Sequence, residues 1–132
     1  MRSVLVHISD ATEQEVAGFL QHAFPFQTGP PWICDVNGDP CLYIDFYRDR
    51  LTEFEPEQLV ELSRALGKEP QTSVVAEVSG RHHGDEQVRC FVAALLSKFP
   101  GLAHDDFTAH YWTAAEISSG YEGRRFFEYT RS

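Results

Sequence analysis

The stretch that decides the fold spans residues 31–47 and reads PWICDVNGDPCLYIDFY. At its centre, Asn37-Gly38 favours a two-residue type I′ turn, because both central residues of that turn need positive φ. With this pair as the loop, the cross-strand pairs are Val36 with Asp39, Asp35 with Pro40, and Cys34 with Cys41. Pro40 has no N–H to donate, and this register gives it a position where none is needed. The stretch therefore predicts an antiparallel β-hairpin.

The two faces of this predicted hairpin differ in composition. Alternation places apolar side chains on the core side, namely Ile33, Leu42, Ile44 and Phe46. The opposite face carries Cys34, Val36 and Cys41 together with a set of aromatic and acidic side chains, Trp32, Asp39, Tyr43, Asp45 and Tyr47. Trp and Tyr dominate binding hot spots, and carboxylates attract a basic partner. This face is therefore either a partner-binding surface or a Trp32–Tyr43 cross-strand pair covered by the tail or a loop.

Segments on both sides of the hairpin alternate between strand and helix patterns. Helices are indicated by capping boxes at Thr12–Glu15 and Thr113–Glu116, by Pro56 as the first helical residue before Gly67, and by an N-cap at Asp85. Strands are indicated at residues 2–8, 73–79 and 106–112, with a last short strand or packed tail around residues 126–129.

The order of these elements predicts the fold class. The first six follow the order β-α-β-β-α-β, which is that of the ferredoxin-like split β-α-β fold. A third helix and a further strand extend that core. We therefore expect one α+β domain over residues 1–132, with its helices mainly on one face of a mixed or antiparallel sheet.

The charge balance narrows the classes of partner. The chain has 11 basic and 20 acidic residues, a net charge of −9, and such a field repels nucleic-acid backbones. It suits a basic protein surface, although it also simply keeps a protein soluble. No apolar run approaches the roughly 20 residues that a membrane span needs, and the first residues enter a strand pattern without a signal-peptide core. We expect a cytoplasmic protein with no membrane contact.

The cysteines do not suggest a structural framework. There are three, without a CxxC pair, which argues against disulfide scaffolds and zinc ribbons. Cys34 and Cys41 face each other in the predicted register, but we expect them to be reduced in the cytosol.

Histidines and aspartates support a second interpretation. His82 and His83 precede a predicted helix, and Asp105, Asp106 and His110 occur further on. Their spacing matches neither HExxH nor a zinc finger, and the chain contains no GxSxG, P-loop or GxGxxG motif. We expect no enzyme activity, no cofactor and no bound metal. The alternative is a small enzyme, or a ligand- or metal-binding protein, that uses this His/Asp cluster of residues 82–110.

One stretch resembles a known class of proteins. Residues 99–117 contain Asp105-Asp106-Phe107 followed by His110, then Trp112-Thr113 followed by Glu116-Ile117, and Phe126-Phe127-Glu128 comes later. This pattern resembles small bacterial immunity proteins that accompany polymorphic or contact-dependent toxins. The resemblance implies a non-catalytic cytoplasmic protein that neutralises a cognate toxin by covering its active or binding site. It supplies no binding residues.

Overall fold

The computed structural model describes residues 2–49, 53–105 and 110–127. They form an α+β fold around a five-stranded antiparallel sheet with the strand order β2-β3-β4-β1-β5. The strands are β1 (Ser3–Ile8), β2 (Trp32–Val36), β3 (Asp39–Phe46), β4 (Thr72–Val78) and β5 (Gly101–Asp105). The helices are α1 (Glu13–Ala23), α3 (Pro56–Leu66), α4 (Asp85–Lys98) and α5 (Ala114–Ser119).

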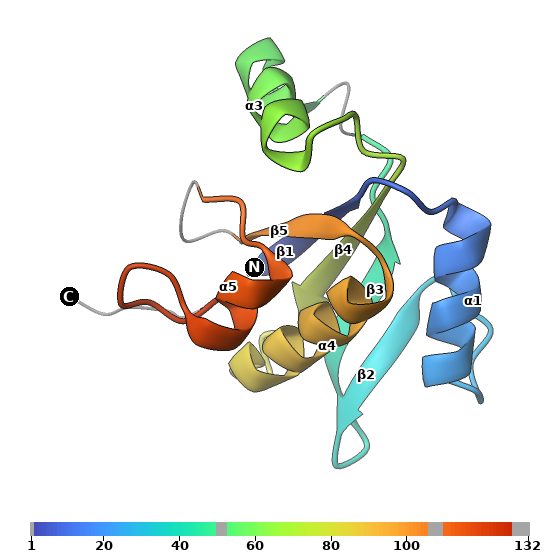
Figure 1. Cartoon of the computed structure of the whole chain (residues 1–132). Coiled ribbons are helices and arrows are strands. Elements are labelled where there is room, and N and C mark those ends of the chain that lie inside the picture. Colours follow the sequence, from blue (N-terminus) through green and yellow to red (C-terminus); the bar gives the residue numbers. More distant parts are fainter. Residues whose placement is uncertain (1, 50–52, 106–109, 128–132) are drawn as a thin grey trace.

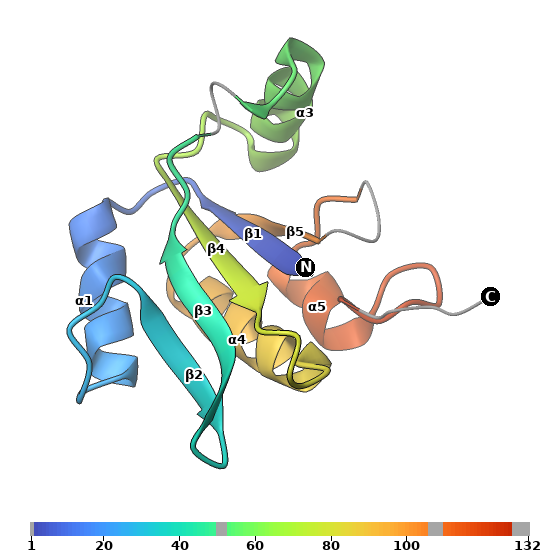
Figure 2. The ribbon, with the colours of Figure 1, turned by 180° about the vertical axis from the view of Figure 1, so that it is seen from behind.

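The helices divide the sheet into a covered face and an open face. Figure 1 shows α1, α4 and α5 in front of the sheet, and Figure 2 shows the opposite face of the strands without a helix across it. Helix α3 lies beyond the ends of the strands in both views (Figures 1 and 2). Within the part of the chain that the structure describes, no helix is long and apolar enough to cross a membrane.

The strand order differs from the predicted ferredoxin-like order, which would place β1 beside β3. Strand β4 lies between them and is antiparallel to both. Because β3 and β4 are antiparallel neighbours, α3 is an excursion within their connection and does not cross over to a parallel strand. A split β-α-β unit exists elsewhere: β4 and β5 run in the same direction on either side of β1, and α4 connects them.

Several local predictions are confirmed at the helix ends. Thr12 and Thr113 accept from the backbone N–H of the residue three positions on, and the glutamates there bond back to the cap residue. Pro56 begins α3, and Gly67 ends it with a left-handed φ of 88°. The N-cap of α4 is Gly84, so the prediction of Asp85 in that role is wrong by one residue.

The predictions near the C-terminus are less accurate. Strand β5 ends at Asp105, so the expected strand at 106–112 is misplaced, and Trp112 only bridges Ala103. Residues 106–109 lie outside the described part of the chain. Phe126 and Phe127 are fully buried, and the continuation of their predicted strand, residues 128–129, is also outside the described residues.

The core lies between the sheet and its helices. Strand β1 contributes Val4, Val6 and Ile8, each at most 1% exposed. Helix α4 contributes the stripe Val88, Val92, Leu95 and Leu96 that its sequence spacing predicts. Each such side chain stabilises the fold by about 1.5–3 kcal/mol through the apolar area it removes from water.

A bulge in the hairpin changes the register that the sequence predicts. Asn37 and Gly38 form the turn with φ of 52° and 81°, and both Val36–Asp39 and Asp35–Pro40 pair as expected. The register then shifts, so that Cys34 pairs with Leu42 and not with Cys41. All three cysteines are free thiols. Because β3 contains one extra residue at this point, the side chains of Trp32, Ile33 and Cys34 lie on the opposite face of the sheet from the one predicted.

This inversion places Trp32 in the core. Trp32 pairs with Ile44, whose side chain is on the covered face, and is 2% exposed. Its indole meets the Phe46 ring edge-on, with the centroids 6.0 Å apart. Ile33 takes the place next to Tyr43 on the open face. The expectation that Trp32 and Tyr43 share a face, with Ile33 in the core, is therefore wrong.

The inversion predicts different costs for two aromatic truncations. We expect Trp32→Ala to lower the free energy of unfolding by about 3–5 kcal/mol, because it empties a buried site. Tyr43→Ala should cost less than about 1 kcal/mol, because this side chain faces solvent. Urea denaturation followed by circular dichroism measures both values. Equal losses for the two variants would contradict the observed register.

Candidate functional site

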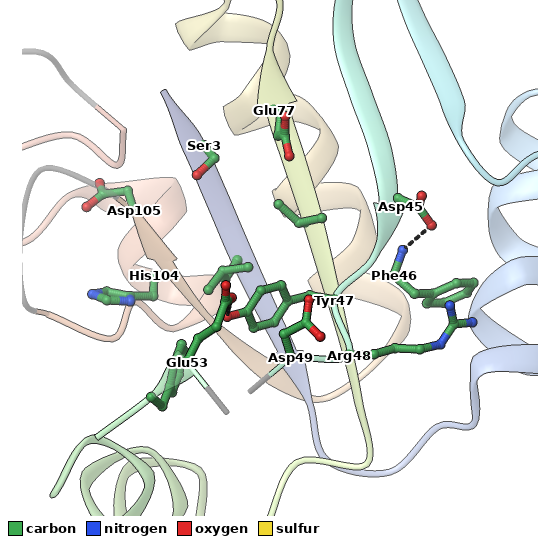
Figure 3. Close-up of a pocket in the computed structure, with 13 residues that line it drawn as sticks. Ser3, Asp45, Phe46, Tyr47, Arg48, Asp49, Glu53, Glu77, His104 and Asp105 are labelled. Carbon is green, nitrogen blue, oxygen red and sulfur yellow. Dashed lines mark hydrogen bonds between the residues drawn. The ribbon is translucent and has the colours of Figure 1, made fainter. Parts of the chain in front are cut away.

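A hollow of about 590 Å³ lies on the open face of the sheet (Figure 3). Its floor comes from three neighbouring strands. Asp45 of β3 pairs with Val75 of β4, and Val75 pairs with Leu5 of β1. One row along, Glu77 pairs with Ser3. Because side chains at paired positions share a face, two apolar side chains form the centre of the floor and polar groups surround them.

Tyr47, which follows β3, and Phe54, which precedes α3, form an aromatic wall. The Tyr47 hydroxyl donates to the Glu53 carboxylate, and the Phe54 ring lies 6.1 Å from the Tyr47 ring. Phe54 also meets the ring of His7 at 5.9 Å, and His7 is fully buried although it belongs to the open face. Tyr47 and Phe54 therefore cover one end of the open face and give the hollow a side wall.

The environment of Tyr47 makes its hydroxyl a firmly held proton donor. Burial raises the pKa of Tyr47 well above the usual range, and the hydrogen bond to Glu53 and the nearby charges of Glu53 and Asp49 raise it further. Tyrosinate beside a carboxylate would bring two negative charges together. Tyr47 therefore stays neutral at any physiological pH and orients the Glu53 carboxylate.

Negative charge dominates the lining. Carboxylates come from β3, β4, β5 and the segment after β3, namely Asp45, Asp49, Glu53, Glu77 and Asp105. Figure 3 shows the Arg48 side chain extending away from Tyr47 towards Phe46.

Of the described residues that line the hollow, two could carry positive charge, and both already contact other side chains. The Arg48 guanidinium donates to both carboxylate oxygens of Glu13, at 2.7 and 3.0 Å, and lies 5.5 Å from the Phe46 ring centroid. The other, His104, has its ring 5.0 Å from that of Tyr111. The hollow is thus suited to a positively charged group that also offers apolar surface.

Three of the five residues predicted for the partner surface lie at or beside this hollow. Asp45 and Tyr47 line it, and Tyr43, 37% exposed, pairs with Glu77 on the same face. Asp39 is at the hairpin turn, where it accepts from Arg81 and contacts His82, both at 3.0 Å. Trp32 lies on the opposite side of the sheet, in the core.

The described histidines of the alternative His/Asp cluster have different partners in the structure. His82 contacts Asp39, whereas the backbone oxygen of His83 accepts from Arg2. His110 stacks on the Tyr121 ring at 3.8 Å and contacts Glu116 at 2.9 Å.

Of the two aspartates in that alternative, the structure describes only Asp105. The Asp105 carboxylate lies by the hollow and accepts from the Phe127 N–H at 3.2 Å. Asp106 is outside the described residues. Within residues 2–49, 53–105 and 110–127, no group of three or more His, Cys, Asp or Glu side chains is arranged to hold a metal ion.

Sequence reasoning missed several residues that line the hollow. Ser3, Glu77 and His104 come from strands that pair only in the folded chain, and Glu53 and Phe54 come from the residues just before α3. In the sequence, Glu77 is distinguished only as the charged residue of a strand pattern that is otherwise mainly apolar. That pattern marks it as a residue of the open face, but does not indicate which strand lies next to it.

Comparisons of the chain with protein-family models, with curated proteins and with solved structures found no match. The resemblance to immunity proteins over residues 99–128 therefore stays a prediction.

The Tyr47–Glu53 pair predicts a measurable change in titration. We expect Glu53→Gln to lower the pKa of Tyr47, because it removes a negative charge that opposes formation of tyrosinate. NMR titration of the tyrosine ring carbons measures the shift. Glu57→Gln, an exposed change on α3, is the matched control and should leave the Tyr47 titration unchanged. An unchanged Tyr47 titration in Glu53→Gln would contradict the pairing.

Proposed function

We propose that the protein is a non-catalytic binding domain that captures a basic protein partner on the open face of its sheet. The observation that carries this proposal is the hollow, in which carboxylates from several strands surround an apolar floor beside aromatic rings. Arginine and lysine side chains combine a positive head group with an apolar stem, so one such side chain would use all three features.

The charge of the whole chain supports the same function. A net charge of −9 gives the molecule a long-range attraction for basic surfaces, and the hollow concentrates part of that charge at one place. Electrostatic complementarity of this kind speeds the encounter of two proteins and fixes their orientation. Tyr43, exposed at the margin of the hollow, adds the rigid aromatic contact area that binding hot spots favour.

The partner class that we propose is a bacterial toxin domain, which would make this protein an immunity protein acting in the cytoplasm. The support is the resemblance of residues 99–128 together with the acidic open face. If this is right, co-expression with the toxin-like product of a neighbouring gene should protect cells from that product. Protection by the wild type, lost in Asp45→Asn/Glu77→Gln, would support the proposal. Growth arrest despite folded wild-type protein would contradict it.

A short arginine-rich peptide tests the basic-partner proposal directly. We expect it to shift the backbone amide NMR signals of Tyr43, Asp45 and Glu77. Asp45→Asn/Glu77→Gln should weaken its binding by about tenfold or more, since hydrogen bonds to charged groups contribute about 1.5–3 kcal/mol each. Isothermal titration calorimetry at constant ionic strength measures the affinity.

The control for this experiment removes the same charge elsewhere. Glu69→Gln/Glu86→Gln changes two exposed residues that do not line the hollow. If both double variants weaken binding equally, the attraction comes from net charge alone and the hollow is not the site. If the control binds like the wild type, the site is local.

A further inference from the structure

A second cavity lies on the opposite, helix-covered side of the sheet. It measures about 450 Å³ and lies between α1 and α4, above the edge strand β2. Phe19 and Phe24 of α1 and Phe91 of α4 form much of its wall. Two of the three cysteines also line it: Cys34 from β2 and Cys90 from α4. The strand and the helix thus present one thiol each to a shared space.

The three thiols differ in their access to solvent. Cys90 is exposed and Cys34 is half-buried, whereas Cys41 is fully buried. Cys41 lies near Gly84, where a Cβ would come within 3.6 Å of its sulfur, and it does not line the cavity. An oxidant dissolved in water therefore reaches Cys90 first, and Cys34 is the second thiol that lines the same cavity.

The surroundings of Cys34 protect its thiol from direct oxidation, so that it can react after the first thiol has been oxidised. Burial raises the pKa of the Cys34 thiol, and the neighbouring Cys41 thiol, the Asp35 carboxylate and the Cys90 thiol raise it further. Because the thiolate is the form that attacks peroxide, a protonated thiol is protected from direct oxidation.

We propose that Cys34 and Cys90 form a reversible disulfide that joins β2 to α4 when the protein meets hydrogen peroxide. The Cys90 thiolate attacks one peroxide oxygen, the O–O bond breaks, and Cys90 becomes a sulfenic acid as hydroxide leaves and takes up a proton. The Cys34 sulfur then attacks the sulfenic sulfur, the S–O bond breaks, and water leaves. The two thiols lose two hydrogens in total, and the peroxide is reduced to two water molecules.

The cavity gives this bond room to form. A disulfide needs the two Cβ atoms about 3.5–4.5 Å apart, so α4 or β2 must be able to adjust its position. Packed side chains would resist that adjustment, but here the space between α1 and α4 is empty of protein atoms. The cross-link closes a long loop of chain and so restricts the unfolded state. The oxidised protein should therefore unfold at a higher temperature than the reduced protein.

Peptide mapping after oxidation tests the proposal. The full-length protein is treated with equimolar hydrogen peroxide, free thiols are blocked, and the protein is digested without reductant. Trypsin releases Cys90 in the peptide 90–98 but leaves Cys34 and Cys41 together in the peptide 3–48. A second protease that cuts before aspartate separates them at Asp35 and Asp39. We expect a linked pair of peptides containing Cys34 and Cys90, lighter by two hydrogens and released by dithiothreitol.

Single substitutions make the assignment unambiguous. Cys41→Ala should keep the cross-link, whereas Cys34→Ala and Cys90→Ala should lose it and should lose the rise in melting temperature on oxidation. The reduced variants are compared with the reduced wild type by circular dichroism to establish that they fold. A Cys34–Cys41 link, a dimer through two Cys90 residues, or sulfinic acid at Cys90 without any link would each overturn the proposal.

Discussion

The β-bulge at Cys41 decides which side of the sheet each residue of β2 faces. Without it, continuous pairing would put Trp32 on the open face beside Tyr43 and Ile33 in the core. With it, Trp32 enters the core against Phe46, and the edge strand presents Cys34 to the space beneath the helices. Gly29 fits this arrangement, because a Cβ at that position would collide with the indole. One inserted residue thus separates an acidic open face from an apolar, thiol-containing covered face.

Features encoded within a few consecutive residues were predictable from the sequence. The turn at Asn37-Gly38 and the capping boxes at Thr12 and Thr113 depend only on local hydrogen bonds and backbone preferences. The strand order was not predictable in this way. Whether β3 lies next to β1 or to β4 depends on contacts between distant segments, and the sequence of α3 is that of an ordinary amphipathic helix in either topology. Only its position beyond the strand ends reveals that it covers no sheet face (Figure 1).

The candidate site, too, was predictable only where it depends on residues that are close together in the sequence. Alternation along β3 identifies Tyr43 and Asp45 as residues of one face, and Tyr47 continues that face beyond the end of the strand. What gives the hollow its character is the set of partners that folding brings to them. Glu77 reaches Tyr43 only through the β3–β4 register, and Glu53 meets Tyr47 only through a hydrogen bond formed in the folded chain. The bulge could not be predicted from the sequence, because the residues on either side of the turn also fit the regular hairpin register.

The hollow gathers like charges, and this arrangement lowers the stability of the free protein. Asp45 and Glu77 are diagonal neighbours on adjacent strands, and like charges this close on one face of a sheet repel each other. Arg48, which lines the hollow, binds Glu13 and lies over Phe46, so its charge is directed away from Tyr47. A cationic side chain from a partner would remove this repulsion on entering the hollow. Under the proposed function, the repulsion between these carboxylates would favour the binding of a basic partner, and salt would screen both effects together.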